Sequence, residues 1–354
     1  MTKGSTTRRP GRRAGDILRV LVPEYIRSGR PVGSRQLAGL CQESLSPATI
    51  RSVTAHLEEL GFLAQPHRSA GRVPTGMGYR FYADSLSKAS ELSPRELRRI
   101  RKILEREMDP ENLMNKTSQI LSTHSDSMGF VLAQPLELAL MQHIQFVKIS
   151  ARRVLVVVIA GAGSVQHRLV AVPKNLSQTD LDQAGRYLIR HFEGNTLPQI
   201  RDKLLSLTSG EGSQENPIKN AILLGSASLP DSDLSSQGES GVYLGGTAQI
   251  IEKPELADHR QASALLRALE EKSQLAKILT ECLQAEEPGP TVTIGLDKHI
   301  PEMGGWAVIS CPYLYHRQVA GSLGILGPAR MSYEKGISLV GSVAKLFGRI
   351  LSNN

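Results

Sequence analysis

A short segment of the sequence, residues 46–60, has the features of a helix with two distinct sides. Ser46 followed by Pro47 is typical of a helix start, because serine caps free N–H groups and proline fits the first turn. Gly61 is suited to end the helix. With about 100° between successive side chains, four apolar residues share one sector and are expected to face a core. These residues are Ile50, Val53, Leu57 and Leu60.

The opposite side of this helix combines one arginine with small side chains. Small side chains let a helix backbone approach the floor of a DNA groove, and an arginine can donate two hydrogen bonds to a guanine, worth about 1–3 kcal/mol of discrimination. An alanine can contact a thymine methyl group. The side is therefore a candidate for reading bases, and an ordinary exposed helix face is the competing interpretation. Its five residues are Ala48, Thr49, Arg51, Ser52 and Ala55.

Four more residues are candidates for contacts with phosphates. Ser34 and Arg35 begin a short predicted helix, 34–40, where free N–H groups and the helix dipole favour an anion. Arg68 and Arg72 flank the tip of a predicted wing, placed to straddle a DNA backbone or enter a minor groove. Each of these side chains, taken alone, fits an ordinary solvated surface equally well.

These candidates depend on a particular order of elements. An apolar stripe from Ile17 predicts a first helix, with Asp16 as its N-cap, Gly29 as its end and a kink or weak turn at Pro23. The helix 34–40, with Ser34 as N-cap, the turn 42–45 and the helix 47–60 come next. Two short strands, 62–65 and one from Val73, form the wing, and a helix 78–88 closes the unit. This order predicts a winged helix-turn-helix domain over residues 15–88.

The distribution of charge supports the same interpretation. Residues 1–88 contain 14 Lys and Arg and 6 Asp and Glu, so their net charge of +8 equals that of the whole chain and the remainder is neutral. A basic domain beside a neutral remainder is expected when one domain meets a polyanion. Residues 1–14 are expected to form a flexible basic arm that adds salt-dependent affinity.

Other bulk features restrict the class of protein. No window approaches 18 consecutive apolar residues and the N-terminus has no apolar stretch, so we expect no membrane span and no secretory signal. The three cysteines are widely spaced and form no CxxC pair, so neither a metal site nor a disulfide framework is indicated. We therefore expect a cytoplasmic protein with reduced thiols and no cofactor.

The rest of the chain has the pattern of an α+β protein with more than one domain. A charged helix, 95–107, links the first domain to the C-terminal part of the chain. Residues 208–241 are rich in Ser, Gly, Asp and Glu and indicate a flexible region or domain boundary. Strands are predicted at 144–149, 154–160, 165–172, 292–295, 306–311 and 319–326, and helices at 181–192, 197–207, 262–283 and 333–351.

Three other functions are alternatives to DNA binding. An enzyme is disfavoured because the nine histidines form no HxxxH or HExxH pair and the glycine-rich stretches lack the Walker lysine and the Rossmann spacing. RNA binding by stacking is disfavoured because aromatic residues make up only 4% of the chain. A small-molecule sensor stays open, since Trp306, Tyr313 and Tyr315 could line a pocket or belong to a core.

Several contiguous motifs resemble the HrcA family of bacterial heat-inducible transcription repressors. The resemblance spans the chain and is densest in residues 15–88 and 320–351. It is carried by Pro31–Ser34, Ser46–Arg51, Leu57–Leu63, Gln65–Thr75, Gly78–Tyr82 and Gly324–Tyr333.

The resemblance implies properties that the residue patterns alone do not. It implies a dimeric repressor that binds an inverted-repeat operator, called CIRCE, upstream of chaperone operons and releases it on heat shock. A GroE-type chaperonin is the implied partner that keeps the repressor active. The implied architecture adds a linker helix, 89–110, then a GAF-like domain, 111–207 and 288–354, interrupted by an inserted dimerising domain at 208–287.

Overall fold

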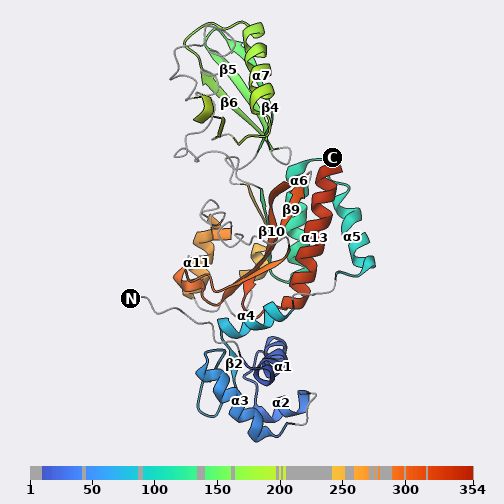
Figure 1. Ribbon diagram of the computed structural model, residues 1–354, viewed down its shortest axis with the longest axis vertical. Helices are drawn as coiled ribbons and strands as arrows, with labels where there is room; N and C mark the ends of the chain where they lie inside the picture. Colours follow the sequence, from blue (N-terminus) through green and yellow to red (C-terminus); the bar gives the residue numbers. More distant parts are fainter. Residues whose placement is uncertain are drawn as a thin grey trace.

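The computed structural model is elongated, with three parts that succeed one another along its length (Figure 1). An N-terminal part lies at one end, a central body contains the C-terminus, and a smaller unit lies at the other end. The structure describes residues 10–41, 45–86, 91–133, 140–160, 164–196, 199–200, 202–204, 241–251, 259–270, 275, 278–279, 289–298, 300–315 and 318–353. The polar stretch 208–240 and most of the arm 1–14 lie outside these residues.

The N-terminal part has the order of elements that the sequence predicts. Three helices are followed by a two-stranded antiparallel hairpin and a fourth helix. Leu18, Leu21, Ile50 and Leu57 are fully buried in its core. The elements are α1 (Arg12–Ser28), α2 (Ser34–Leu40), α3 (Pro47–Glu59), β1 (Leu63–Ala64), β2 (Val73–Pro74) and α4 (Gly76–Ser85).

Helix ends in this part agree with the predictions at some positions and differ at others. Ser46 caps α3, and Gly29, with a φ of 65°, ends α1 as predicted. The predicted cap at Asp16 is wrong, because α1 starts at Arg12 with Gly11 as its N-cap, five residues before the predicted cap. Gly33, not Ser34, is the N-cap of α2. Each correction moves a start toward the N-terminus, where glycine adopts the extended cap conformation.

Pro23 does not interrupt the first helix. α1 continues through it as one helix, although proline removes one backbone hydrogen bond. Leu21 and Val22, directly before the proline, are fully buried in the core. Their burial holds the helix against the rest of the domain and offsets the missing hydrogen bond.

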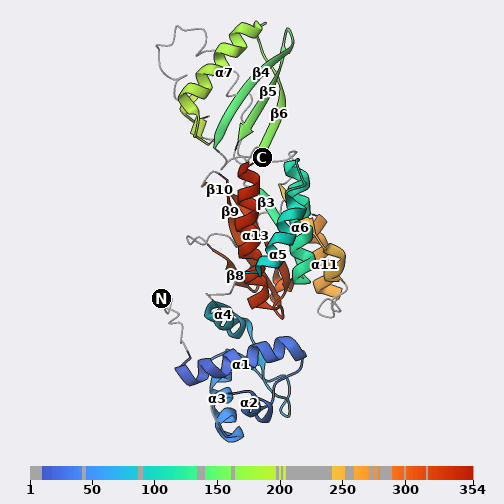
Figure 2. The ribbon, with the colours of Figure 1, turned by 90° about the vertical axis from the view of Figure 1, so that its right-hand side faces the viewer.

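The central body is built on a five-stranded antiparallel sheet. The strand order is β7-β3-β10-β9-β8. Figure 2 shows the helices α5, α6 and α13 together on one side of the body. The strands are β3 (Met128–Ala133), β7 (Val242–Gly245), β8 (Thr291–Ile294), β9 (Trp306–Tyr315) and β10 (Gln318–Pro328). The helices are α5 (Pro94–Leu104), α6 (Pro110–Ser125), α10 (Thr247–Ile251), α11 (His259–Glu270), the 3₁₀ helix η2 (Pro301–Met303) and α13 (Tyr333–Asn353).

The two faces of this sheet belong to different cores. Side chains that alternate along β9 and β10 pack either against α6 and α13 or against α11. Trp306 lies in the core on the α11 side, whereas Tyr313 lies in the core on the α13 side, with its ring 4.7 Å from that of Phe347. These two aromatic residues therefore do not line one common pocket.

A separate sheet forms the unit at the far end of the molecule. The strand order is β4-β5-β6 and α7 covers one face. The chain enters this unit after β3 and returns to the central sheet at β7. The elements are β4 (Met141–Ser150), β5 (Arg153–Ala160), β6 (Ser164–Ala171) and α7 (Gln178–Phe192).

This topology corrects the predicted boundaries of the insertion. We expected the interrupted domain to include 111–207 and the insertion to be 208–287. Instead, the described residues 140–204 form the separate unit, and β7 and α11 belong to the central body. The two antiparallel sheets have similar apolar strands, so local pattern does not reveal which strands pair with which.

The N-terminal part is fixed to the central body by specific contacts. Arg330 donates a hydrogen bond through Nη1 to the carbonyl of Ile26 at the end of α1, at 3.2 Å. Tyr333 is buried, with its ring 5.9 Å from that of Tyr79 and 6.4 Å from that of Tyr82. One apolar core runs through both parts. These contacts, from here called the junction, place the N-terminal part in a defined orientation.

Candidate nucleic-acid interface

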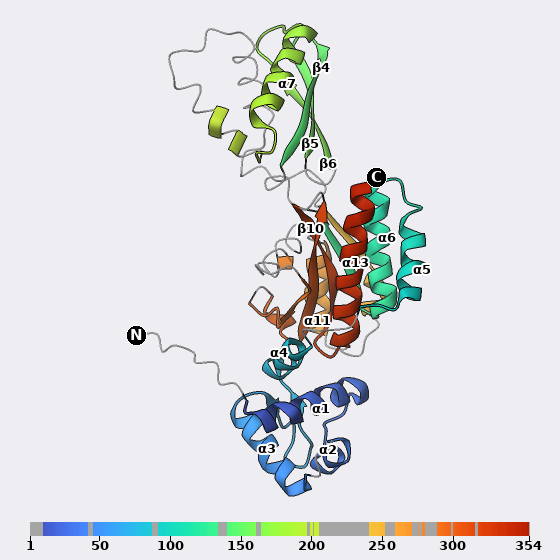
Figure 3. The ribbon, with the colours of Figure 1, turned by 45° about the vertical axis from the view of Figure 1, so that its right-hand side comes forward.

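Helix α3 presents the predicted base-reading side chains at the end of the molecule. In the three views, α2 and α3 lie on the side of the N-terminal part away from the central body (Figures 1 to 3). Ala48, Arg51 and Ser52 are exposed, whereas Thr49 and Ala55 are half-buried. Arg51 has no ion-pair partner among the described residues, so its guanidinium is available for a ligand.

The first turn of α3 is held by its cap. The Ser46 hydroxyl accepts a hydrogen bond from the Thr49 N–H at 3.1 Å, and the two hydroxyl oxygens lie 2.9 Å apart. Thr49, one of the predicted base-reading residues, thus already has a hydroxyl partner. Its structural contribution is to fix the turn from which Arg51 projects.

The inner side of α3 differs in part from the prediction. Ile50 and Leu57 are fully buried as predicted, but Val53 and Leu60 are only half-buried. Thr54 is buried instead, and its hydroxyl donates to the Arg51 carbonyl at 3.1 Å. A threonine can occupy this inner position because its hydroxyl is satisfied within the helix.

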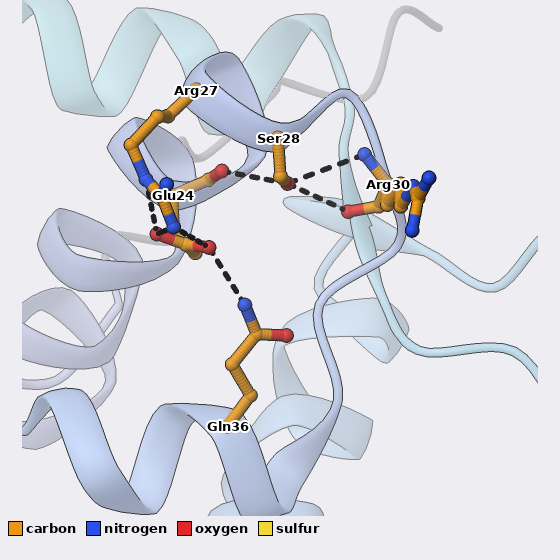
Figure 4. A network of polar contacts seen from close by, with 5 residues as sticks. All are labelled: Glu24, Arg27, Ser28, Arg30 and Gln36. Carbon is orange, nitrogen blue, oxygen red and sulfur yellow. Dashed lines mark hydrogen bonds and ion pairs between the residues drawn. The ribbon is translucent and has the colours of Figure 1, made fainter.

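Helix α2 is joined to α1 through a buried carboxylate. Glu24 is 7% exposed and accepts hydrogen bonds from both Nε and Nη2 of Arg27, at 3.1 and 2.8 Å, and from Gln36 Nε2 at 2.7 Å (Figure 4). The Ser28 hydroxyl continues this cluster to the backbone of Arg30. A buried charge is stable only when its hydrogen bonds are made, so this cluster fixes the angle between α1 and α2. Sequence analysis did not identify Glu24 or Gln36.

The predicted phosphate contacts on α2 lie at its start. Ser34 is the first helical residue and is half-buried, and Arg35 next to it is exposed. Because the N-cap is Gly33, no N-cap side chain is hydrogen-bonded to the free N–H groups at the start of α2. Arg35 is therefore accessible, whereas its contact with a phosphate stays a prediction.

The turn of the hairpin is braced by a residue that sequence analysis missed. Gln65 Nε2 donates to the carbonyl oxygens of Arg68 and Ala70, at 3.0 and 2.9 Å. The His67 carbonyl accepts from the Ala70 N–H at 2.8 Å. Pro66, His67, Arg68 and Ser69 are exposed. Arg68 thus projects from an ordered turn, as expected for a wing.

Arg72 does not flank the tip of the wing, and this part of the prediction is wrong. Its Nη2 lies 2.9 Å from Glu58 Oε2 on α3, its side chain is only 16% exposed, and its Nε is buried without a partner. Its backbone pairs with Val32, with hydrogen bonds of 2.9 Å in both directions. This pairing turns the side chain back toward α3, so Arg72 links the hairpin to that helix.

The pairing of Val32 with Arg72 depends on a small residue at position 71. A Cβ atom on Gly71 would lie 2.4 Å from the Val32 carbonyl oxygen. We expect Gly71→Ala to separate the paired segments and to lower the free energy of unfolding. Overpacking usually costs about 1–3 kcal/mol, and the loss here should lie near the upper end of that range. Urea denaturation measures this loss. Gly39→Ala is the control, because no atom lies within 4 Å of its added Cβ; equal losses in both variants would contradict the steric argument.

The acids and thiols elsewhere do not form a second site among the described residues. Burial raises the pKa of the Cys311 thiol to about 11, which keeps it protonated. The described residues contain no cluster of His, Cys, Asp and Glu able to hold a metal ion. Within the described ranges, we also find no helix with the length and apolar character needed to cross a membrane.

Comparisons with known proteins agree with this arrangement. The family model of the HrcA protein C-terminal domain matches residues 111–337. The heat-inducible transcription repressor HrcA of Geobacter sulfurreducens is 38% identical over 95% of this chain and 96% of its own length. The repressor of the same name from Methylobacillus flagellatus is 32% identical over 97% of this chain and 99% of its own.

A solved structure shows the same fold at lower identity. The crystal structure described as that of a hypothetical protein aligns with a TM-score of 0.60 and 18% identity, over 98% of this chain and 99% of that one. The relatives match over nearly their whole length, and their family consists of repressors and not of enzymes. The chain therefore belongs to the HrcA family of heat-inducible transcription repressors.

Proposed function

We propose that the chain represses chaperone operons by binding an inverted-repeat operator of the CIRCE type as a homodimer. The observation that carries the proposal is Arg51, exposed and unpaired among the described residues on a capped helix that is backed by a buried core. In this proposal residues 15–88 act as a winged helix-turn-helix and α3 enters the major groove. Arg35 and Arg68 supply phosphate contacts, which add affinity without sequence preference.

The base-reading side of α3 is narrower in this proposal than the sequence suggested. Arg51 supplies hydrogen bonds to a base edge, and Ala48 and Ser52 permit close approach because they are small and exposed. Thr49 and Ala55 are half-buried and lie at the edges of the side of α3 that approaches the DNA. Arg72, paired with Glu58, orients the hairpin.

Dimerisation is supported by the open face of the β4-β5-β6 sheet. α7 covers one face, while Leu155, Val157 and Ile159 lie on the other and are only half-buried. Ile149 and Leu169, on the neighbouring strands, are 55% and 51% exposed. A self-complementary apolar face is suited to a two-fold dimer. We propose that two copies meet there, and that the central body is a GAF-like domain.

Release on heating is part of the same proposal. We propose that heat lowers the stability of the C-terminal part, and that a GroE-type chaperonin in the cytoplasm returns the repressor to its active state, as the family resemblance implies. A repressor that kept full operator binding for hours above the heat-shock temperature, without chaperonin, would contradict this mechanism.

The experiment compares three DNA duplexes. One carries both half-sites, one carries a single half-site, and one is random; binding is measured across temperature, with and without chaperonin. We expect the complete operator to bind at least roughly 10³-fold more tightly than random DNA and clearly more tightly than one half-site. Equal affinity for operator and random DNA would contradict the repressor mechanism, and equal affinity for one and two half-sites would contradict the dimer.

A further inference from the structure

Helix α5 carries a row of positive charges that the reading domain does not account for. Arg98 and Arg99 lie three and four residues after Arg95 and four and three residues before Lys102, and Arg106 continues the row four residues later, just beyond the helix. At 3.6 residues per turn, side chains at these intervals share one face. All five are exposed. These five residues are called the basic stripe.

The basic stripe is presented by a firmly anchored helix. Ile100 and Leu104, on the opposite side of α5, are fully buried against the central body. The Ser342 hydroxyl accepts from the Leu92 N–H at 3.2 Å, and Lys345 Nζ lies 2.7 Å from a carboxylate oxygen of Glu91. Both contacts join the segment before α5 to α13, so the stripe has a fixed place on the body.

The cations of the stripe have no acidic partner among the described residues. The one acid on the helix, Glu96, is engaged by the Ser93 cap, whose hydroxyl lies 2.6 Å from Glu96 Oε2. That hydrogen bond lowers the pKa of Glu96. Like charges three and four residues apart destabilise a helix, so an anion that bound along the stripe would relieve their repulsion.

The composition of the stripe favours nucleic acid over an acidic protein. Four of its five cations are arginines, whose planar guanidinium groups match phosphate oxygens in pairs. The stripe itself contains no apolar or aromatic side chain, whereas protein interfaces depend on such anchors at their centre. Met108, which is 84% exposed, lies beyond its end. Sequence-independent DNA binding needs only cations along the backbone.

We propose that the basic stripe of α5 is a second, sequence-independent contact for duplex DNA. The stripe belongs to the central body and not to the domain that carries α3, so it engages DNA outside the half-site that α3 reads: flanking duplex or a second segment (Figures 2 and 3). The proposal rests on the proposed function only where it concerns DNA next to the operator. Binding of long random DNA by the stripe does not require it.

The test uses the full-length protein and the double variant R98Q/R99Q. Affinity and its salt dependence are measured on a minimal operator and on the same operator within a duplex several times longer. Each phosphate contact adds about 0.9 to the slope of log affinity against log salt. On the long duplex, we expect the variant to show a slope of log affinity against log salt that is smaller by up to about two, and an affinity roughly tenfold lower at about 0.1 M salt. Its affinity for the minimal operator should be unchanged.

The control is R186Q/R190Q, which removes the same charge from exposed positions on α7, on the side of the far unit opposite to the proposed dimer face. It should leave the slope on the long duplex unchanged. An R98Q/R99Q protein that matches wild type on the long duplex, or loses equally on both duplexes, overturns the proposal. So does loss of polyglutamate binding with unchanged DNA binding, which would assign the stripe to an acidic protein. If wild type did not prefer its operator, the proposed function would fail, and long random DNA would still test the stripe.

Discussion

Arg51→Ala is expected to weaken operator binding by roughly 10- to 100-fold, because a bidentate contact to a base contributes about 1–3 kcal/mol. Binding to random DNA should fall by only a few-fold, since one charge among several is lost. The side chain is exposed and unpaired among the described residues, so the free energy of unfolding should change by less than about 0.5 kcal/mol. Competition binding with operator and random duplexes measures the two losses separately.

Arg51→Lys is the matched variant for this prediction. Lysine keeps the charge but not the planar pair of donors, so it should restore random-DNA binding and only part of the operator affinity. Equal losses on operator and random DNA in Arg51→Ala would show that the side chain contacts the backbone and not a base. A large fall in stability would instead show a structural contribution that the exposed position does not indicate.

The parts of this site that could be predicted are those with local causes. The start of α3 is explained by Ser46 and Pro47, and the burial of Ile50 and Leu57 by their spacing along one helix. The exposure of Arg51 is explained by the same spacing. Each of these inferences needs only neighbours within one or two turns.

The position of Arg72 could not be predicted because its causes are distant in the sequence. Its direction depends on pairing with Val32, forty residues earlier, and on Glu58 of α3. An exposed arginine near a turn and a partly buried arginine that links two elements have the same local sequence. The brace from Gln65 was missed for the same reason, since its partners are backbone carbonyls of the folded turn.

The division of the C-terminal strands between two sheets also lay beyond the sequence. Six strand segments were predicted correctly, because apolar runs bounded by turns are local features, whereas β3 and β7 of the central sheet were not predicted. Which strands share a sheet depends on pairing: β3 meets β10, which lies almost 200 residues later in the chain. The polar stretch 208–241 marked a boundary in composition, but the separate unit precedes it.

Breaking the junction is expected to make operator affinity depend less on the spacing between the two half-sites. Tyr333 is 1% exposed and packs against two tyrosines of α4, and Arg330 binds the end of α1. Burial raises the pKa of Tyr333 above its ordinary value. With this junction intact, the central body sets the orientation of each reading helix, and a dimer then presents two helices at a defined spacing.

Tyr333→Ala should therefore weaken binding to the complete operator by roughly 10- to 100-fold, because the second half-site is no longer bound at a high effective concentration. The variant should also distinguish poorly between the native spacing and a spacing lengthened by half a helical turn. Its affinity for one half-site should stay unchanged, since no residue of α3 is altered. Affinities on operators of graded spacing provide the measurement.

A variant that leaves the core intact separates orientation from folding. Tyr333→Ala empties a buried site and is expected to cost about 3–5 kcal/mol of stability, as for other large aromatic residues. Arg330→Gln removes the guanidinium contact to Ile26 and leaves the aromatic cluster in place. It should relax the spacing preference in the same direction, by a smaller factor, with the unfolding transition nearly unchanged.

If Arg330→Gln kept the full spacing preference, or if both variants lost affinity for a single half-site, the junction would stabilise the reading domain without orienting it. The salt dependence gives a second criterion, because a change of orientation leaves the phosphate contacts of each half-site, and hence its salt slope, unaltered.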